Sequence, residues 1–309
     1  MPERLPMYGG QAVMEGVMMR GKQSVAIAMR APDKQIVIHK ERLGAIYRSR
    51  LTRIPFLRGL VMLWDALGLG MRALTISANL QTGEDEKLEG PALYLTLGFS
   101  LLLAISLFFL LPAAAGQLGE VILVRSAGQG IPASQAPDPT AWAAWIGNLV
   151  EGIVRLLLLI GYISLVGKIP EIKRVFMYHG AEHKTINAYE SHAELTPDVV
   201  KNFPLEHPRC GTSFLLTLVL LSILIFTLLG PLPITWRLVS RIAFIPILAG
   251  IAYEYIRWTS NHLDWPVVRW IVRPNLALQR LTTREPTLDM LEVSISAFEA
   301  MRSDEPGVT

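Results

Sequence analysis

Long apolar stretches constrain this chain more than any other feature, because about 20 apolar residues in a helix cross the hydrocarbon core of a bilayer. Such stretches cover residues 91–116, 141–168, 213–232 and 239–258. Hydrophobic residues make up 51% of the 309-residue chain and charged residues only 18%, and the mean hydropathy is +0.37. This composition is too apolar for an ordinary soluble domain. The sequence therefore predicts a mainly α-helical, polytopic membrane protein with about four transmembrane helices.

Lys and Arg are distributed unevenly between these predicted spans. Residues 1–90, 169–212 and 259–309 are rich in them, whereas the predicted outer loop, residues 117–140, contains only Arg125. Cytoplasmic loops of membrane proteins carry an excess of Lys and Arg. The alternation therefore predicts a multi-pass protein of the cell membrane with both termini in the cytoplasm.

The same basic segments bear on the partners of the chain. A basic cytoplasmic face favours the lipid bilayer and its anionic lipid head groups as partners. The sequence contains no basic-aromatic motif typical of nucleic-acid binding, so we expect no nucleic-acid partner. A protein partner or a homo-oligomer stays open.

The N-terminal region, residues 1–55, has the pattern of a small cytoplasmic β-sheet. Two runs rich in β-branched residues, 24–30 and 35–40, flank a Pro-Asp turn and predict a hairpin. Residues 12–20, which lie between glycines, are a candidate third strand. Together these patterns predict a sheet over roughly residues 9–42.

Helical patterns outside the predicted spans suggest interfacial elements. Residues 56–80 place apolar side chains at helical spacing, which predicts an interfacial or amphipathic helix that a polar linker, ending at residue 90, joins to the first span. In the tail, residues 259–309, a Trp-rich segment near 265–272 is typical of the head-group level. A terminal amphipathic helix is expected over 286–301.

The predicted cytoplasmic loop 169–212 contains a His-x-x-Glu-His motif. Residues four apart lie on one face of a helix, so His179 and His183 can share a divalent metal ion. Glu182 can then act as a general base toward metal-bound water, and this residue order is the inverted zinc-protease signature. Glu190 shares the helix face and is a further candidate ligand. The alternative is an exposed helix whose charged side chains pair weakly.

A second cluster, His207-x-x-Cys210, directly precedes the predicted span 213–232. An imidazole and a thiolate this close resemble half of a zinc site. The single cysteine also excludes an intrachain disulfide. We expect His179, His183, His207 and Cys210 to hold a divalent metal, with zinc as the expected ion. The alternative is that Cys210 packs as a small apolar residue while His207 faces water.

Two further pairs of polar residues are candidates. His262 and Asp264, after the last predicted span, can supply a ligand or a supporting carboxylate, or they form a polar turn that ends a helix. Glu151 and Arg155 stand four residues apart inside a predicted span. Ionisable groups at membrane depth are costly and are often functional, but this pair is equally consistent with a structural ion pair.

Four segments of the sequence, 9–21, 178–190, 207–213 and 274–286, resemble the bacterial YqhQ-like family. The resemblance extends over nearly the whole chain. It implies a bacterial multi-span membrane protein with a predicted metal-dependent activity, and it supplies no reaction, substrate or ligand set. It also draws attention to Glu15, which lies in the first of these segments and is a candidate for completing a site.

Two functions of different classes follow from these patterns. The first is an integral-membrane protein with a metal site on its cytoplasmic face, acting as a metal-dependent hydrolase on a membrane-associated substrate. The second is a non-enzymatic membrane scaffold, a partner-binding module or a transporter, in which the metal or the polar cluster is structural. An inverted zinc-protease site needs a distal acidic ligand, which the sequence does not identify. A closed set of four ligands that includes a cysteine is typical of structural zinc.

Overall fold

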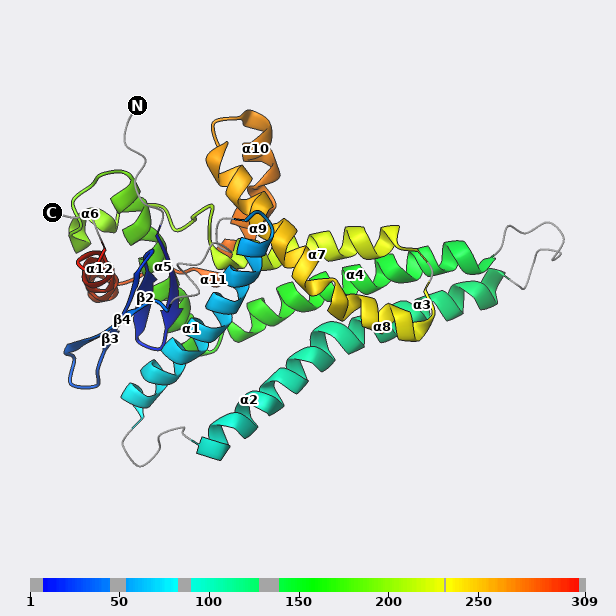
Figure 1. Ribbon diagram of the computed structural model, residues 1–309, viewed down its shortest axis with the longest axis horizontal. Coiled ribbons are helices and arrows are strands. Elements are labelled where there is room, and N and C mark those ends of the chain that lie inside the picture. Colours follow the sequence, from blue (N-terminus) through cyan, green and yellow to red (C-terminus); the bar gives the residue numbers. More distant parts are fainter. Residues whose placement is uncertain (1–7, 45–53, 83–89, 128–138, 231, 306–309) are drawn as a thin grey trace. The chain divides into compact units, whose positions relative to one another are not determined.

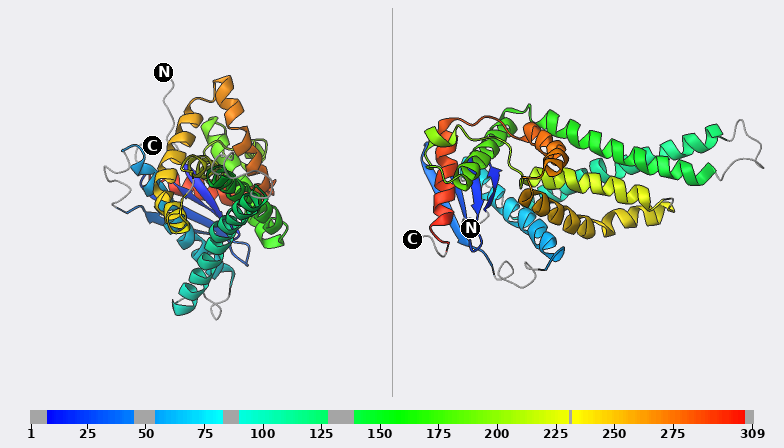
Figure 2. Two further views of the ribbon diagram at one scale, coloured as in Figure 1. Left: turned by 90° about the vertical axis from the view of Figure 1, so that its right-hand side faces the viewer. Right: turned by 90° about the horizontal axis from the view of Figure 1, so that it is seen from above.

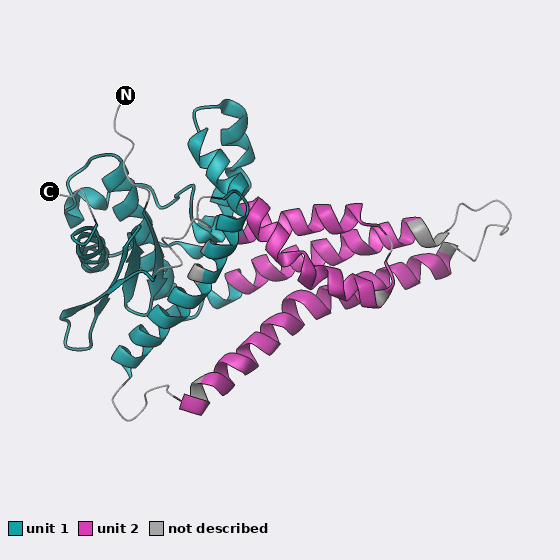
Figure 3. Cartoon of the chain, viewed as in Figure 1, with its two compact units in different colours: residues 1–88, 164–214, 253–309 teal, residues 89–163, 215–252 magenta. Residues whose placement is uncertain are grey.

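The computed structural model describes residues 8–44, 54–82, 90–127, 139–230 and 232–305. The described chain is mainly helical and contains one small antiparallel sheet near the N-terminus (Figure 1). It divides into two compact units (Figure 3), each formed from separate stretches of sequence: unit 1 consists of residues 1–88, 164–214 and 253–309, and unit 2 of residues 89–163 and 215–252.

The sheet of unit 1 is an antiparallel meander in the order β1-β2-β3-β4. Its strands are β1 (Gly9–Val13), β2 (Gly16–Arg20), β3 (Ser24–Arg30) and β4 (Ile36–Arg42). The predicted N-terminal sheet is therefore confirmed. The expectation of one strand over 12–20 was wrong, because a tight turn at Met14 and Glu15 divides this stretch between β1 and β2. Glu15 has a φ of 52°, in the left-handed region that tight turns often use.

Helices cover both faces of this sheet (Figure 2). The helices α5 (Pro170–Glu190) and α12 (Leu288–Arg302) pack on one face, where Val17 and Met19 meet a core that includes Phe298. The helix α1 (Leu57–Gln81) packs on the other face, where Met18 joins Ala73. Because successive strand residues point to opposite faces, burial on both sides explains why β2 and β3 are nearly continuous apolar runs.

The remaining elements of the described chain are helices. They are α2 (Gly90–Ile105), the π-helical turn η4 (Ser106–Leu110), α3 (Leu111–Ala127), α4 (Pro139–Val166), α7 (Gly211–Leu228), α8 (Ile234–Ala243), α9 (Ile245–Asn261), α10 (Pro266–Ile271) and α11 (Arg273–Thr282), and the short α6 (Pro197–Val200) precedes α7. Three helical segments of the described residues are long and apolar enough to cross a membrane, Tyr94–Ser126, Trp142–Val166 and Gly211–Leu228. The pair α8–α9, bent by 41°, is a fourth if it is counted as one span.

The predicted outer loop 117–140 begins too early, because α3 remains helical to Ala127. A close contact between helices α3 and α4 lies at the predicted boundary. A Cβ atom added to Gly116 would lie only 2.6 Å from the carbonyl oxygen of Gly147, so the two backbones approach as only glycine allows. Hydropathy does not reveal such packing between helices. The prediction therefore ended the helix at residue 116, where the uncharged stretch ends.

Unit 2 buries polar side chains and exposes apolar ones. Glu151 is only 1% exposed, and its carboxylate accepts hydrogen bonds from Arg155 at 2.8 Å and from Arg241 at 2.7 and 2.9 Å. The expected pairing of Glu151 with Arg155 is thus confirmed, whereas the part of Arg241 was not foreseen. On the same helix as Arg241, Ile242 is 68% exposed. Polar inside and apolar outside is the arrangement that suits helices surrounded by lipid.

Candidate metal centre

The His-x-x-Glu-His motif lies on α5, in the part of the helix that packs under the sheet. His179 and His183 are one turn apart, and their ring centroids are separated by 4.4 Å. The side chain of His183 is 1% exposed and that of His179 is 14% exposed, with Glu182 also buried. The alternative of an exposed helix with weakly paired charges is therefore wrong.

Backbone carbonyl groups orient both imidazole rings. His179 Nδ1 lies 2.9 Å from the carbonyl oxygen of Thr282, and His183 Nδ1 lies 2.5 Å from that of Leu205. A carbonyl oxygen only accepts hydrogen bonds, so each Nδ1 is the donor and carries the proton. In the neutral rings both Nε2 atoms then have a free lone pair, as metal-binding histidines require.

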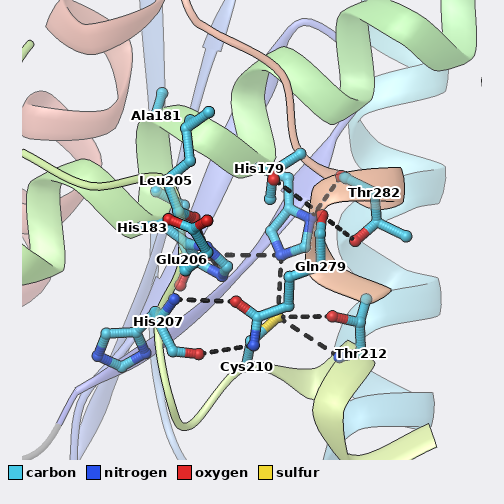
Figure 4. Close-up of polar contacts among 12 residues, drawn as sticks. His179, Ala181, His183, Leu205, Glu206, His207, Cys210, Thr212, Gln279 and Thr282 are labelled. Atoms are coloured by element: carbon cyan, nitrogen blue, oxygen red, sulfur yellow. Dashed lines mark hydrogen bonds and ion pairs between the residues drawn. The ribbon is translucent and has the colours of Figure 1, made fainter. Parts of the chain in front are cut away.

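Cys210 joins the two histidines from a separate part of the chain. Its Sγ lies 3.1 Å from His179 Nε2, and donor atoms of His179, His183 and Cys210 all lie within 4.8 Å of one another (Figure 4). His183 Nε2 is buried and has no hydrogen-bond partner among the described residues. Zinc binds imidazole nitrogen and thiolate sulfur at about 2.0–2.3 Å. The donor set and the unpartnered nitrogen therefore fit a bound transition metal.

The position of Cys210 is set by the turn that leads into α7 and by one glutamine. Thr212 approaches the sulfur with its backbone N–H at 3.4 Å and its hydroxyl at 3.1 Å. The fully buried side chain of Gln279, on α11, binds both sides of His207: its Oε1 accepts from the backbone N–H, and its Nε2 donates to the carbonyl oxygen and to Ser213 Oγ. Nothing in the sequence pattern around Gln279 indicated this role.

Glu182 lies between the imidazoles and the edge of the sheet. Its Oε2 is 3.6 Å from His183 Nε2 and 4.0 Å from His179 Nε2. On the other side it accepts a backbone hydrogen bond from Gly10, in β1. A Cβ atom at position 10 would lie 2.7 Å from Glu182 Cγ, which explains the glycine there. Burial raises the pKa of Glu182 to about 7, although His179 and the Gly10 hydrogen bond oppose this shift.

His207 and Glu190 face one another outside this group. The His207 ring points away from Cys210 (Figure 4), and its Nε2 lies 3.6 Å from a carboxylate oxygen of Glu190. Burial lowers the pKa of His207 to about 4. Glu190 also forms an ion pair with Arg209. Of the four predicted ligands, the structure thus brings together His179, His183 and Cys210, while His207 and Glu190 form a neighbouring pair.

Glu15 does not reach the cluster either. In the turn between β1 and β2 its carboxylate binds Arg174 at 2.5 Å and accepts a hydrogen bond from the Tyr178 hydroxyl at 3.3 Å. The hydrogen bond from Arg174 lowers the pKa of Glu15. Glu15 therefore links the β1–β2 hairpin to α5, close to the start of the His-x-x-Glu-His motif.

The remaining candidates also lie apart from the three donors. His262 packs between Trp258 and Trp265, with ring centroids 5.1 and 5.0 Å away, and its Nδ1 lies 2.8 Å from the Trp258 carbonyl oxygen. Asp264 is exposed. Glu151 belongs to the buried ion-pair network of unit 2.

Comparison with known proteins places the chain in a family. Residues 54–304 match the model described as "Protein of unknown function (DUF1385)". The chain is also similar to the protein named "Uncharacterized protein YqhQ" of Bacillus subtilis (strain 168), at 34% identity over 313 residues, which cover 96% of this chain and 92% of the relative. No solved structure matches. The chain therefore belongs to the YqhQ-like family, which the DUF1385 model describes.

Proposed function

We propose that this protein is an integral-membrane hydrolase that uses a divalent metal, expected to be zinc. His179 Nε2, His183 Nε2 and Cys210 Sγ would hold the ion. The observation that carries the proposal is the convergence of these three donors within 4.8 Å, with both histidines oriented by carbonyl groups. Catalytic zinc is typically held by three protein ligands and keeps a fourth position open, whereas structural zinc has four.

The surrounding residues support a hydrolytic reaction. When bound, a divalent metal supplies Lewis acidity, which lowers the pKa of water and polarises an acyl or phosphoryl oxygen. Glu182 is the general base: it takes the proton of the attacking water and returns it to the leaving group. The hydrogen bond from Gly10 fixes the carboxylate, and the short distances to both Nε2 atoms keep it beside the ligands.

Chain connectivity supports a membrane-associated substrate. Cys210 directly precedes Gly211, the first residue of a helix apolar enough to span the membrane. The helix α5 begins at Pro170, four residues after α4 ends at Val166. We therefore propose a lipid or a membrane-bound peptide as the substrate, and the basic residues of the flanking loops favour the cytoplasmic face.

A structural metal is the second candidate function. His179 and His183 lie on α5, whereas Cys210 precedes α7, so a shared ion would link two separate parts of unit 1. Such a link stabilises a fold without taking part in a reaction. The two candidates differ in what they require of Glu182, which is essential only for catalysis.

Metal analysis of the purified full-length protein in detergent tests the proposal. We expect one transition metal per chain, and loss of that metal in His179→Ala, His183→Ala and Cys210→Ser. His39→Ala, on exposed β4, is the matched control and should keep the metal. Glu182→Gln should also keep the metal but lose hydrolysis or the cellular phenotype. Protein that binds no metal under any loading condition would rule out both candidates, and an active Glu182→Gln would favour the structural one.

A further inference from the structure

A surface rich in tryptophan and arginine follows α9. We call it the Trp–Arg surface and define it by Trp265, Val267, Arg269, Trp270 and Arg273. Trp265 is 55% exposed, Val267 67% and Trp270 68%. Both arginines are exposed as well. Single exposed apolar residues are common, but two tryptophans and a valine within six residues form a patch that needs an explanation.

The exposure of these residues results from the way α10 packs. Val268 and Val272, which are four residues apart, are buried within the protein. Val267 and Trp270, three residues apart, lie on the opposite side. The helix is therefore apolar on both sides, with one side packed against protein and the other without a described protein partner.

The neighbouring aromatic rings make this surface rigid. Trp258, His262 and Trp265 pack together, with Trp258 and Trp265 at right angles and 6.3 Å apart. His262 is further fixed by a hydrogen bond from its Nδ1 to the Trp258 carbonyl oxygen. A surface held in place in this way loses little conformational entropy on binding.

The charge of the segment is strongly one-sided. Residues 257–273 contain three arginines, Arg257, Arg269 and Arg273, and one acid, Asp264, which gives a net charge of +2 with His262 neutral. Exposed arginine beside exposed tryptophan complements an anionic layer that is polar outside and apolar beneath.

The position in the chain identifies such a layer. The helix α9, which forms the fourth candidate span together with α8, ends at Asn261. Trp265 follows four residues later and, at about 3.5 Å per extended residue, lies within about 14 Å of the helix end. A surface so close to the end of a candidate span is within reach of the lipid head groups.

We propose that the Trp–Arg surface docks on the anionic head-group layer of the bilayer. Trp265, Val267 and Trp270 insert between the head groups, and Arg269 and Arg273 bind lipid phosphate groups. A second copy of the chain and another segment of the same chain are the competing occupants. The proposal involves none of the residues of the metal centre and is independent of the proposed function.

Photo-crosslinking of the full-length protein distinguishes these occupants. The protein carries benzoylphenylalanine at position 267 or 270 and is reconstituted in nanodiscs of phosphatidylcholine and phosphatidylglycerol. Position 38, exposed on β4, is the control. We expect lipid adducts by intact mass at 267 and 270 and none at 38. Cross-linked dimers, or internal cross-links without added lipid mass, would overturn the proposal.

A charge variant tests the choice of anionic lipid. Arg269→Gln with Arg273→Gln, combined with the probe at 270, should reduce the share of phosphatidylglycerol among the adducts to its mole fraction in the bilayer. The control pair Lys22→Gln and Lys201→Gln removes the same charge from exposed positions of unit 1 and should leave the share unchanged. No enrichment of phosphatidylglycerol in the unsubstituted protein, or equal enrichment in the arginine variant, would contradict the anionic assignment.

Discussion

Glu182 and His207 are buried titratable residues close to the cluster, and their environments shift their pKa values in opposite directions. Burial favours the neutral form of each group. It raises the pKa of the Glu182 carboxyl to about 7 and lowers that of the His207 imidazole to about 4. Glu182 gains protons relative to the unfolded chain and His207 loses them, so the two residues make opposite contributions to the dependence of stability on pH.

The first prediction concerns Glu182→Gln in metal-free protein. The folded-state pKa lies above the ordinary value of 4.5, so the folded state binds more protons between pH 4.5 and 7, and stability falls as pH rises through this window. The glutamine variant lacks this loss and should be more stable above pH 7, by at most roughly 3 kcal/mol. Thermal unfolding in detergent with a chelator, from pH 4 to 8, measures the difference. A difference that does not change with pH would contradict the assignment.

The second prediction concerns His207→Asn. The folded-state pKa of about 4 lies below the ordinary value of 6.5, so the unfolded chain binds more protons between these values. The contribution of His207 is therefore present above pH 6.5 and is lost as pH falls toward 4, by up to roughly 3 kcal/mol. The stability difference between the unsubstituted protein and His207→Asn should shrink over this range. His39→Asn, at an exposed position, is the control and should show no such trend.

At the scale of elements, the site depends on how closely β1 approaches α5. The carboxylate of Glu182 reaches the backbone of Gly10 across this contact, and the turn at Glu15 fastens the same hairpin to Arg174. The position of the proposed base, Glu182 on α5, therefore depends on its contact with β1.

The third prediction compares two adjacent glycines. A Cβ atom at Gly10 would lie 2.7 Å from Glu182 Cγ and 2.8 Å from the Met18 carbonyl oxygen, whereas one at Gly9 meets nothing within 4 Å. Gly10→Ala should therefore destabilise the protein by about 1–3 kcal/mol, and Gly9→Ala should be tolerated. Thermal unfolding of the two variants side by side provides the measurement. Equal effects would mean that Glu182 does not pack against β1 as described.

The fourth prediction applies the same comparison to unit 2. Gly116→Ala places a Cβ atom 2.6 Å from the Gly147 carbonyl oxygen and should separate α3 from α4, at a cost of about 1–3 kcal/mol. Gly161→Ala, also on α4, meets nothing within 4 Å and should be neutral or stabilising by up to about 1 kcal/mol. Unfolding in detergent distinguishes the two. A destabilised Gly161→Ala with an unaffected Gly116→Ala would show that α3 and α4 do not meet at these glycines.

Features that depend on neighbouring residues in the sequence could be predicted, whereas contacts between distant residues could not. Strands β3 and β4 and the common helix face of His179 and His183 are local patterns, and the sequence revealed them. The packing of α12 on β2 and the hydrogen bond from Gly10 to Glu182 join residues more than 150 positions apart, and no periodicity encodes them. Gln279 escaped notice for the same reason, because its partners at His207 lie 72 residues away.

At the scale of the whole molecule, the two units bury different kinds of side chain. Unit 1 packs an apolar core against its sheet, whereas unit 2 encloses the charged side chains of Glu151, Arg155 and Arg241 and turns apolar side chains outward. Composition alone predicted apolar helices, but only the structure revealed that their polar residues form one buried network. The candidate metal centre lies in unit 1, and the chain passes directly from Cys210 into a helix long and apolar enough to cross a membrane.

X-ray absorption spectroscopy of the zinc-loaded, full-length protein tests the three-ligand metal centre. We predict one sulfur at about 2.3 Å and two imidazole nitrogens at about 2.0–2.1 Å, with a light-atom ligand completing the shell. The sulfur contribution should disappear in Cys210→Ser and persist in His207→Asn. A shell without sulfur, or one that is unchanged in Cys210→Ser, would contradict a metal centre formed by His179, His183 and Cys210.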